Sequence, residues 1–148
     1  MKSFAYAIHG MLDTVRTERN MRIHLCFAFY VIIAGIVTQL SALEWIAVLI
    51  CIGLVTALEC INTALESLCD TVCPERSEGI RKAKDASAAA VLCTAIVAAI
   101  VGGFIFFRTE KIALAVNFLN SHTAAALVIL FTLIPLGFFV RGRKREHK

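Results

Sequence analysis

The sequence predicts an all-α integral membrane protein with one N-terminal helix at the membrane interface and four transmembrane helices. Of its 148 residues, 59% are hydrophobic and only 18% are charged, and the mean hydropathy is +0.78. A soluble domain averages about 45–50% apolar and about 25% charged residues, and a small soluble domain leaves much of its surface in water. The composition therefore excludes a secreted domain, a disordered tail and a cytosolic enzyme, and any chemistry belongs to the membrane helices.

The first helix is expected at residues 3–19, where it lies in the membrane interface. Apolar residues recur at helical spacing along one face, namely Phe4, Ile8, Met11, Leu12 and Val15. The remaining surface is polar, which is typical of a helix lying in the membrane plane. Packing against protein is the alternative, but the chain offers no soluble body to receive this face. The segment also lacks a continuous apolar core, so no signal peptide is expected.

Four apolar segments account for the expected transmembrane helices. Crossing the ~30 Å hydrocarbon layer takes about 20 helical residues. The second segment qualifies only if its helix continues past Leu58, and no residue before Pro74 interrupts it. At about 45 Å in length, that helix would extend about three turns beyond the membrane. The expected spans are residues 21–40, 44–73, 84–107 and 123–140.

The basic residues predict the orientation, because cytoplasmic segments carry an excess of Lys and Arg. All but two of the 15 Lys and Arg residues lie in the N-terminal segment, the central loop and the C-terminal tail: Lys2, Arg16, Arg19, Arg22, Arg76, Arg81, Lys82, Lys84, Arg141, Arg143, Lys144, Arg145 and Lys148. The other two, Arg108 and Lys111, lie in the connection at 108–122. Both termini and the central loop are therefore expected in the cytoplasm. A scattered net charge of +4 does not indicate a nucleic-acid partner.

A polar stripe runs along the second span from the membrane interior toward the cytoplasm. At about 100° per residue its members share about a third of the helix circumference: Glu59, Asn62, Thr63, Glu66 and Asp70. Such residues are costly to place in a membrane and are functional by default. A solvated helix end would explain Asp70 and Glu66. It does not explain Glu59, because Thr56 is the only polar residue among the fourteen before it.

Acidic and basic groups also gather around the expected cytoplasmic side. Lys84 and Asp85 lie where the third span begins, and the N–H groups at a helix N-terminus favour phosphate. The residues at 18–24 add a carboxylate and several cations, and carboxylate oxygens can hold Mg²⁺. This set suggests phosphoryl transfer to a membrane molecule, which depends on positioning and charge neutralisation. For Arg81 and Lys82, contact with lipid headgroups is the simpler interpretation.

These motifs resemble the prokaryotic diacylglycerol kinase family over about residues 4–107. The resemblance rests on two patterns: Glu59-x-x-Asn62-Thr63-Ala64-x-Glu66-x-x-x-Asp70 and Lys84-Asp85-x-x-Ala88-Ala89-x-Val91-Leu92. The segment Glu18-Arg-Asn-Met-Arg-Ile-His24 resembles the undecaprenol kinase branch, which is common in Gram-positive bacteria. The resemblance implies a homotrimer with a surface helix and three transmembrane helices per subunit, and with active sites near the cytoplasmic interface between subunits.

Catalytic and metal-binding roles follow from the resemblance. Glu59 matches the catalytic base that takes the proton of the lipid hydroxyl, where it also binds the substrate. Asn62 matches the residue that supports the reacting centre. Glu18 and Glu66 match the residues that hold the metal bridging the ATP phosphates.

The resemblance also implies contacts to the nucleotide and the lipid. Lys84 matches the lysine on the ATP phosphates, Asp85 its nucleotide-binding neighbour, and Ala88 a lipid contact. Four less distinctive positions align with nucleotide contacts: Tyr6, Glu75, Arg76 and Ser77. The kinase domain is expected at residues 1–107. Residues 108–148 form a C-terminal extension, with one additional transmembrane helix, that the resemblance does not cover.

The expected function is an ATP- and magnesium-dependent lipid kinase of the bacterial cytoplasmic membrane that converts undecaprenol to undecaprenyl phosphate. Diacylglycerol, giving phosphatidic acid, is the alternative substrate, since both lipids present a hydroxyl at the same depth. Two other classes are a small proton-coupled transporter using Glu59 and a non-catalytic lipid-binding or assembly protein. A transporter does not explain why Glu18, Glu66 and Lys84 gather on one side.

Overall fold

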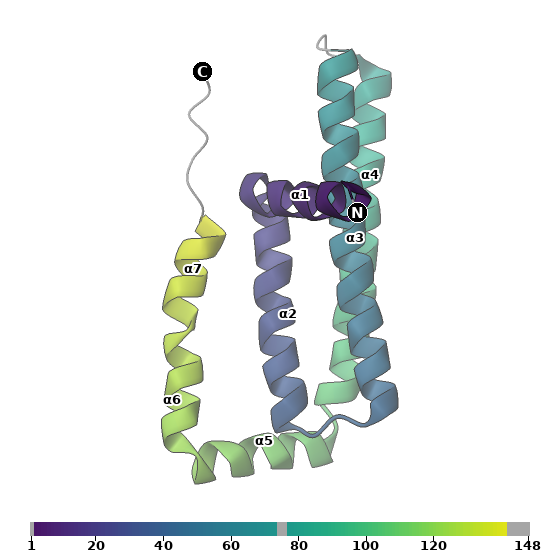
Figure 1. Cartoon of the computed structure of the whole chain (residues 1–148). Helices are drawn as coiled ribbons and strands as arrows, with labels where there is room; N and C mark the ends of the chain where they lie inside the picture. Colours follow the sequence, from purple (N-terminus) through teal and green to yellow (C-terminus); the bar gives the residue numbers. More distant parts are fainter. Residues whose placement is uncertain (1, 74–76, 142–148) are drawn as a thin grey trace.

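The regular secondary structure is entirely helical in the residues that the structure, a computed structural model, describes: 2–73 and 77–141. In chain order the helices are α1 (Lys2–Thr17), α2 (Arg19–Val37), α3 (Ala42–Val72), α4 (Glu78–Phe106), α5 (Thr109–Ser121), α6 (Thr123–Phe131) and α7 (Leu133–Arg141). Helices α2, α3 and α4 stand side by side, α1 crosses them on one side, and α5 crosses beneath their lower ends (Figure 1). Helices α6 and α7 then return alongside α2.

This arrangement confirms the predicted all-α membrane fold. Helices α2, α3 and α4 are each long and apolar enough to cross a membrane. A fourth span results if Thr109–Ser121 and Ala126–Arg141, which meet at 101°, count as one broken segment. Within the described residues the chain therefore offers three or four candidate spans. Helix α4 begins at Glu78, earlier than the span expected from residue 84, because the polar turn before the apolar segment is also helical.

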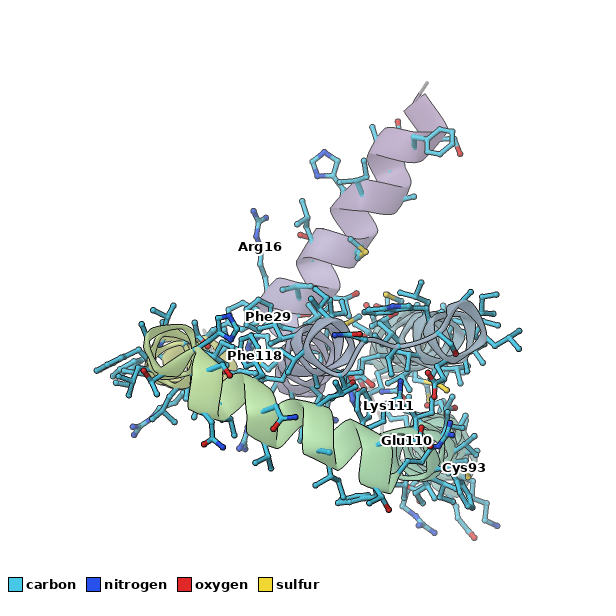
Figure 2. All side chains as sticks on the ribbon, turned by 90° about the horizontal axis from the view of Figure 1, so that it is seen from below. Arg16, Phe29, Cys93, Glu110, Lys111 and Phe118 are labelled. Carbon is cyan, nitrogen blue, oxygen red and sulfur yellow. The ribbon has the colours of Figure 1, made fainter. Side chains whose placement is uncertain are left out.

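Helix α1 is fixed to α2 at its C-terminal end by a buried arginine. The guanidinium Nη1 of Arg22 donates to the carbonyl oxygens of Val15 at 3.0 Å and Arg16 at 3.1 Å. These carbonyls belong to the last turn of α1, which lacks intrahelical donors and where a cation is favoured by the helix dipole. Helix α1 extends from α2 and α3 on the side away from α4 (Figure 2). It exposes Phe4 and Ile8, as expected of an interfacial helix.

A close hairpin joins α2 to α3. A Cβ atom at Gly35 would lie 2.8 Å from the Trp45 ring, so the two helices approach this closely only with glycine there. Helix α3 then starts with a capping box, in which Ser41 Oγ accepts from the Glu44 N–H at 3.4 Å and Glu44 Oε2 accepts from the Ser41 N–H at 2.8 Å. The buried apolar cluster beside the hairpin contains Leu40, Val48 and Ile105.

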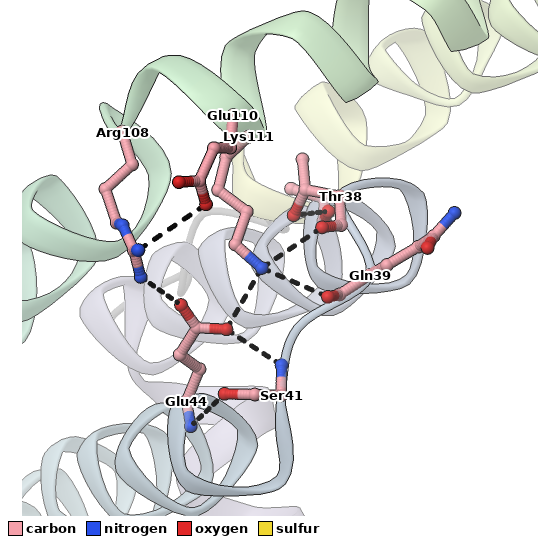
Figure 3. A network of polar contacts seen from close by, with 8 residues as sticks. Thr38, Gln39, Ser41, Glu44, Arg108, Glu110 and Lys111 are labelled. Carbon is pink, nitrogen blue, oxygen red and sulfur yellow. Dashed lines mark hydrogen bonds and ion pairs between the residues drawn. The ribbon is translucent and has the colours of Figure 1, made fainter.

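The connection at residues 108–122, for which the sequence predicted no secondary structure, contains the helix α5. At 13 residues this helix is too short to span a membrane. Its Lys111 is only 7% exposed and donates to the carbonyl oxygens of Thr38 at 3.2 Å and Gln39 at 3.0 Å. It also forms a 3.0 Å ion pair with Glu44 (Figure 3). Lys111 thus caps the C-terminal end of α2 and ties α5 to α3.

Helices α6 and α7 occupy the region of the fourth expected span, at residues 123–140. They are separated at Thr132, and Pro135 explains the break because it has no N–H to donate to the carbonyl of Phe131. The Thr132 hydroxyl forms a 2.9 Å hydrogen bond with the hydroxyl of Tyr30 on α2. The extension is therefore attached to α2 at two places, by Lys111 at the end of the helix and by Thr132 along its length.

Candidate functional site

The polar stripe of α3 passes from a buried carboxylate to an exposed one. Glu59 is 1% exposed and Asn62 is 8% exposed, whereas Glu66 is half-buried and Asp70 is exposed. Their spacing of three and four residues keeps them on one side of the helix. Helices α3 and α4 continue past the level of α1 (Figure 1). The stripe therefore connects the buried part of the bundle with the protruding end of α3.

One hydrogen-bonded chain crosses from α3 to α4 in the middle of the stripe. Asn62 Nδ2 donates to Glu66 Oε1 at 3.1 Å, one turn further along α3. The Ser87 hydroxyl of α4 donates to Asn62 Oδ1 at 2.6 Å. The two helices are thus held in a register that fixes the side chain of Asn62.

Glu59 is buried and incompletely partnered. Its Oε2 atom has no hydrogen-bond partner among the described residues. Two further acids, Glu18 and Glu66, act electrostatically on its carboxylate. An ionised carboxylate buried without a cation or a full set of donors is unfavourable. The position therefore suits a group that accepts a proton.

A cavity of about 270 Å³ lies against Glu59. Its polar lining comes from α3, with Glu59, Asn62 and Glu66, and from α2, with Asn20 and His24. Its apolar lining comes mainly from α4 and includes Ala88. A cavity with both polar and apolar lining suits an amphiphilic molecule whose hydroxyl group meets the acids.

A larger cleft, of about 770 Å³, lies between α1 and α3. Asp13, Glu18, Glu66 and Asp70 contribute carboxylates to its lining. Glu18 occupies the corner between α1 and α2, and its side chain makes no capping hydrogen bond. Glu66 lines the smaller cavity as well, so the two cavities share one carboxylate.

The carboxylate oxygens that line the larger cleft are ligands suited to Mg²⁺. Glu18 and Glu66, the predicted metal ligands, line the same space. Within residues 2–73 and 77–141, no group of three or more His, Cys, Asp or Glu side chains is arranged to hold a metal ion. Mg²⁺ does not need such a group, because it keeps several waters and binds through one or two carboxylates together with substrate phosphates.

The two predicted phosphate-site residues of α4 are both paired. Lys84 forms a 2.5 Å ion pair with Asp70, which lines the larger cleft. Lys84 therefore lies at the edge of that cleft. Asp85 is largely exposed and accepts a 3.0 Å hydrogen bond from Arg81 on its own helix.

Of the four weaker nucleotide assignments, the two that the structure describes, Tyr6 and Ser77, line neither cavity. Tyr6 is 72% exposed on α1 and lines neither of them. The Ser77 hydroxyl caps α4 by accepting from the Ile80 N–H at 3.2 Å. Glu75 and Arg76 lie outside the described residues.

The structure adds two residues to which sequence reasoning gave no separate role. Ser87 lies one turn after Lys84 and contacts Asn62. His24, named only as part of the 18–24 segment, lines the cavity beside Glu59. The signal for Ser87 was its position on the α4 face that also carries buried Val91.

Comparison with known proteins gives a family match over most of the chain. The sequence model of prokaryotic diacylglycerol kinase matches residues 5–106. An undecaprenol kinase of Bacillus subtilis (strain 168) is 39% identical over 105 residues, which cover 71% of this chain and 85% of that protein. A diacylglycerol kinase of Synechocystis is 43% identical over 102 residues, 68% of this chain and 58% of its own length.

A diacylglycerol kinase of Haemophilus influenzae is 31% identical over 109 residues, which cover 72% of this chain and 92% of that protein. No solved structure matches the chain. The family match contains the polar stripe and the walls of both cavities, and it excludes α5, α6 and α7. The chain therefore belongs to the prokaryotic diacylglycerol kinase family and is a multi-pass membrane lipid kinase.

Proposed function

We propose that the chain transfers the γ-phosphate of ATP, bound with Mg²⁺, to the hydroxyl of undecaprenol and so produces undecaprenyl phosphate. The kinase domain is residues 1–107, and residues 108–148 are an extension of it. The observation that carries this proposal is the carboxylate of Glu59, which is 1% exposed with Oε2 unpartnered and faces a cavity with both polar and apolar lining.

Glu59 is the proposed catalytic base. The lipid hydroxyl gives its proton to the Glu59 carboxylate as the hydroxyl oxygen bonds to the γ-phosphorus. The bond from that phosphorus to the bridging oxygen breaks, and ADP leaves. A general base within reach of the attacking hydroxyl typically increases the reaction rate by about 10²–10⁴-fold. Ala88, which lines the same cavity as Glu59, is proposed to contact the lipid.

Glu18 and Glu66 are the proposed ligands of Mg²⁺. When bound there, Mg²⁺ would neutralise charge on the ATP phosphates. The proposal is supported by the lining of the larger cleft, which both carboxylates share, and by Glu66, which also lines the lipid cavity. Asn62 supports the reacting centre through its hydrogen bond to Glu66.

Lys84 is proposed to exchange its ion pair with Asp70 for the ATP phosphates, because an exposed pair of this kind holds little free energy. Asp85 is proposed as its neighbour at the nucleotide. The proposal extends to Tyr6, Glu75, Arg76 and Ser77 on the strength of the resemblance alone.

The choice of undecaprenol rests on the relative with 85% coverage and on the segment from Glu18 to His24. Diacylglycerol is the second candidate, because a diacylglycerol kinase is 43% identical over a shorter share of its length. Both lipids are tested with labelled γ-phosphate ATP in mixed micelles, with and without Mg²⁺. Faster labelling of undecaprenol supports the proposal. Faster labelling of diacylglycerol overturns the lipid assignment, and labelling of neither overturns the kinase function.

We also propose that the chain is a homotrimer of the bacterial cytoplasmic membrane, with shared sites on its cytoplasmic side. Its support is the resemblance and the distribution of basic residues. Mixing the inactive variants Glu59→Gln and Glu18→Gln tests shared sites. Recovery of activity in mixed oligomers is expected if different subunits supply the two residues, and no recovery would place both residues in one subunit.

A further inference from the structure

We propose that Ser87 is a positioning residue that orients the Asn62 amide, and through it the Glu66 carboxylate, for the metal-bound nucleotide. This inference rests on the proposed function of Glu66 as a metal ligand. Helix α4 contributes no proposed metal ligand, and through Ser87 it takes an indirect part in metal binding.

The contacts connect three side chains in one line. Ser87 Oγ lies 2.6 Å from Asn62 Oδ1, and Asn62 Nδ2 lies 3.1 Å from Glu66 Oε1. Asn62 is 8% exposed, so most of its surface is covered by neighbouring residues. Among the described residues, Ser87 is the one donor to Asn62 Oδ1.

The carboxylate at one end of this line decides how the amide is turned. An ionised carboxylate accepts hydrogen bonds and donates none. The NH₂ group of Asn62 must therefore face Glu66, and Oδ1 must face Ser87. The reversed amide would place Oδ1 against the Glu66 carboxylate, and two acceptors would repel each other.

The hydroxyl of Ser87 completes the assignment because it has one proton. Its oxygen lies 2.9 Å from the Lys84 carbonyl on its own helix and 2.6 Å from Asn62 Oδ1. The Lys84 carbonyl lies within a helix, where a backbone N–H of the same helix can donate to it. Asn62 Oδ1 has no backbone donor of this kind, so the Ser87 hydroxyl donates its hydrogen bond to Asn62 Oδ1. A buried amide oxygen without its donor would be destabilised.

The consequence is that Ser87 acts on metal binding without contacting the metal. Groups that orient a metal ligand affect affinity by about 10–100-fold when removed. Ser87 lies on α4, whereas Asn62 and Glu66 lie on α3. The geometry of Glu66 therefore depends on the register between the two helices and not on α3 alone.

The test measures metal binding directly as well as turnover. Binding of Mn²⁺, as a spectroscopic substitute for Mg²⁺, is followed by electron paramagnetic resonance with a non-hydrolysable ATP analogue. Ser87→Ala is expected to raise the Mn²⁺ dissociation constant by about tenfold, while the KM for the lipid stays unchanged. Ser87→Thr, which keeps the hydroxyl, is expected to restore most of the affinity.

A double-mutant cycle separates positioning from general destabilisation. In an Asn62→Ala background, Ser87→Ala is expected to add no further loss of Mn²⁺ affinity, because the residue it orients is absent. Thr94→Ala is the matched control, since the Thr94 hydroxyl donates at 2.6 Å only to Ala90 of its own helix. That variant is expected to bind Mn²⁺ as the wild type does.

Two results would overturn the inference. One is an unchanged Mn²⁺ affinity in Ser87→Ala when Glu66→Gln in the same assay loses it. The other is an equal loss in Ser87→Ala with and without Asn62. Failure of the proposed function is distinguishable, because it is seen in the wild type as absence of γ-phosphate transfer to either lipid.

Discussion

Helix α3 carries two buried or nearly buried glutamates with opposite surroundings. Glu44 begins the helix, and its two carboxylate oxygens accept from Arg108, Lys111 and the Ser41 N–H (Figure 3). Glu59 lies further along, and its Oε2 accepts from no described residue. Two further acids act electrostatically on Glu59. The Glu44 carboxylate accepts from three donors, whereas Glu59 Oε2 accepts from none of the described residues.

The difference indicates a structural role for the Glu44 carboxylate and a functional role for the Glu59 carboxylate. A buried ion pair with all its hydrogen bonds satisfied fixes the position of the elements that carry it. A buried polar atom without a partner stabilises nothing, and in a native protein it calls for an explanation such as catalysis. The first group is thus expected to govern stability and the second to govern turnover.

The largest effect on stability is expected when Glu44 loses its buried partner Lys111. Lys111→Ala removes the buried ammonium that donates to Glu44 and to the carbonyls at the end of α2, which is expected to lower the free energy of unfolding more than any other substitution below. Trp45 is the only tryptophan and packs against Gly35 in this hairpin, so its fluorescence reports unfolding in detergent. An unchanged transition would show that α5 does not hold the hairpin.

A smaller effect is expected at the carboxylate shared by the two cavities. Glu66→Gln removes a proposed metal ligand and is expected to raise the Mg²⁺ concentration for half-maximal activity by at least about tenfold. Stability in the fluorescence assay is expected to stay near that of the wild type. Glu78→Gln, at an exposed acid on α4, is the control. An unaltered Mg²⁺ requirement in Glu66→Gln would remove this residue from the metal site.

Tyr30→Phe tests the second attachment of the extension. It removes the hydroxyl that bonds to Thr132 at 2.9 Å and keeps the ring. The expected loss is about 1 kcal/mol of unfolding free energy, with turnover unchanged. A loss as large as that of Lys111→Ala would mean that the attachment along α2 holds the extension as firmly as the one at its end.

The smallest effect is expected for an exposed ion pair. Lys82 and Glu78 are 2.7 Å apart on α4, with side chains 68% and 71% exposed. Lys82→Ala is expected to change the unfolding free energy by no more than about 0.5 kcal/mol. A large change in the same fluorescence assay would show that the contribution of an ion pair to the stability of this protein does not depend on its burial.

Local patterns in the sequence were sufficient for the N-terminal helix, the first three spans and the polar stripe. The apolar face of α1, the long second span and the shared side of Glu59, Asn62 and Glu66 all follow from helical periodicity. The hydrogen bond from Ser87 to Asn62 does not, because it depends on the register between two helices. In the sequence, Lys111 served only as one of two basic residues in the connection at 108–122. Its buried position follows only from the packing of α5 against the hairpin.

The central claim is tested most directly by comparing Glu59→Gln with Glu44→Gln in one preparation. We expect Glu59→Gln to lose γ-phosphate transfer to lipid by about 10²–10⁴-fold, while nucleotide binding and the unfolding transition of Trp45 are retained. We expect Glu44→Gln to keep turnover below its lowered melting temperature. Full lipid phosphorylation by Glu59→Gln, with the protein folded and Mg²⁺–ATP present, would contradict the account.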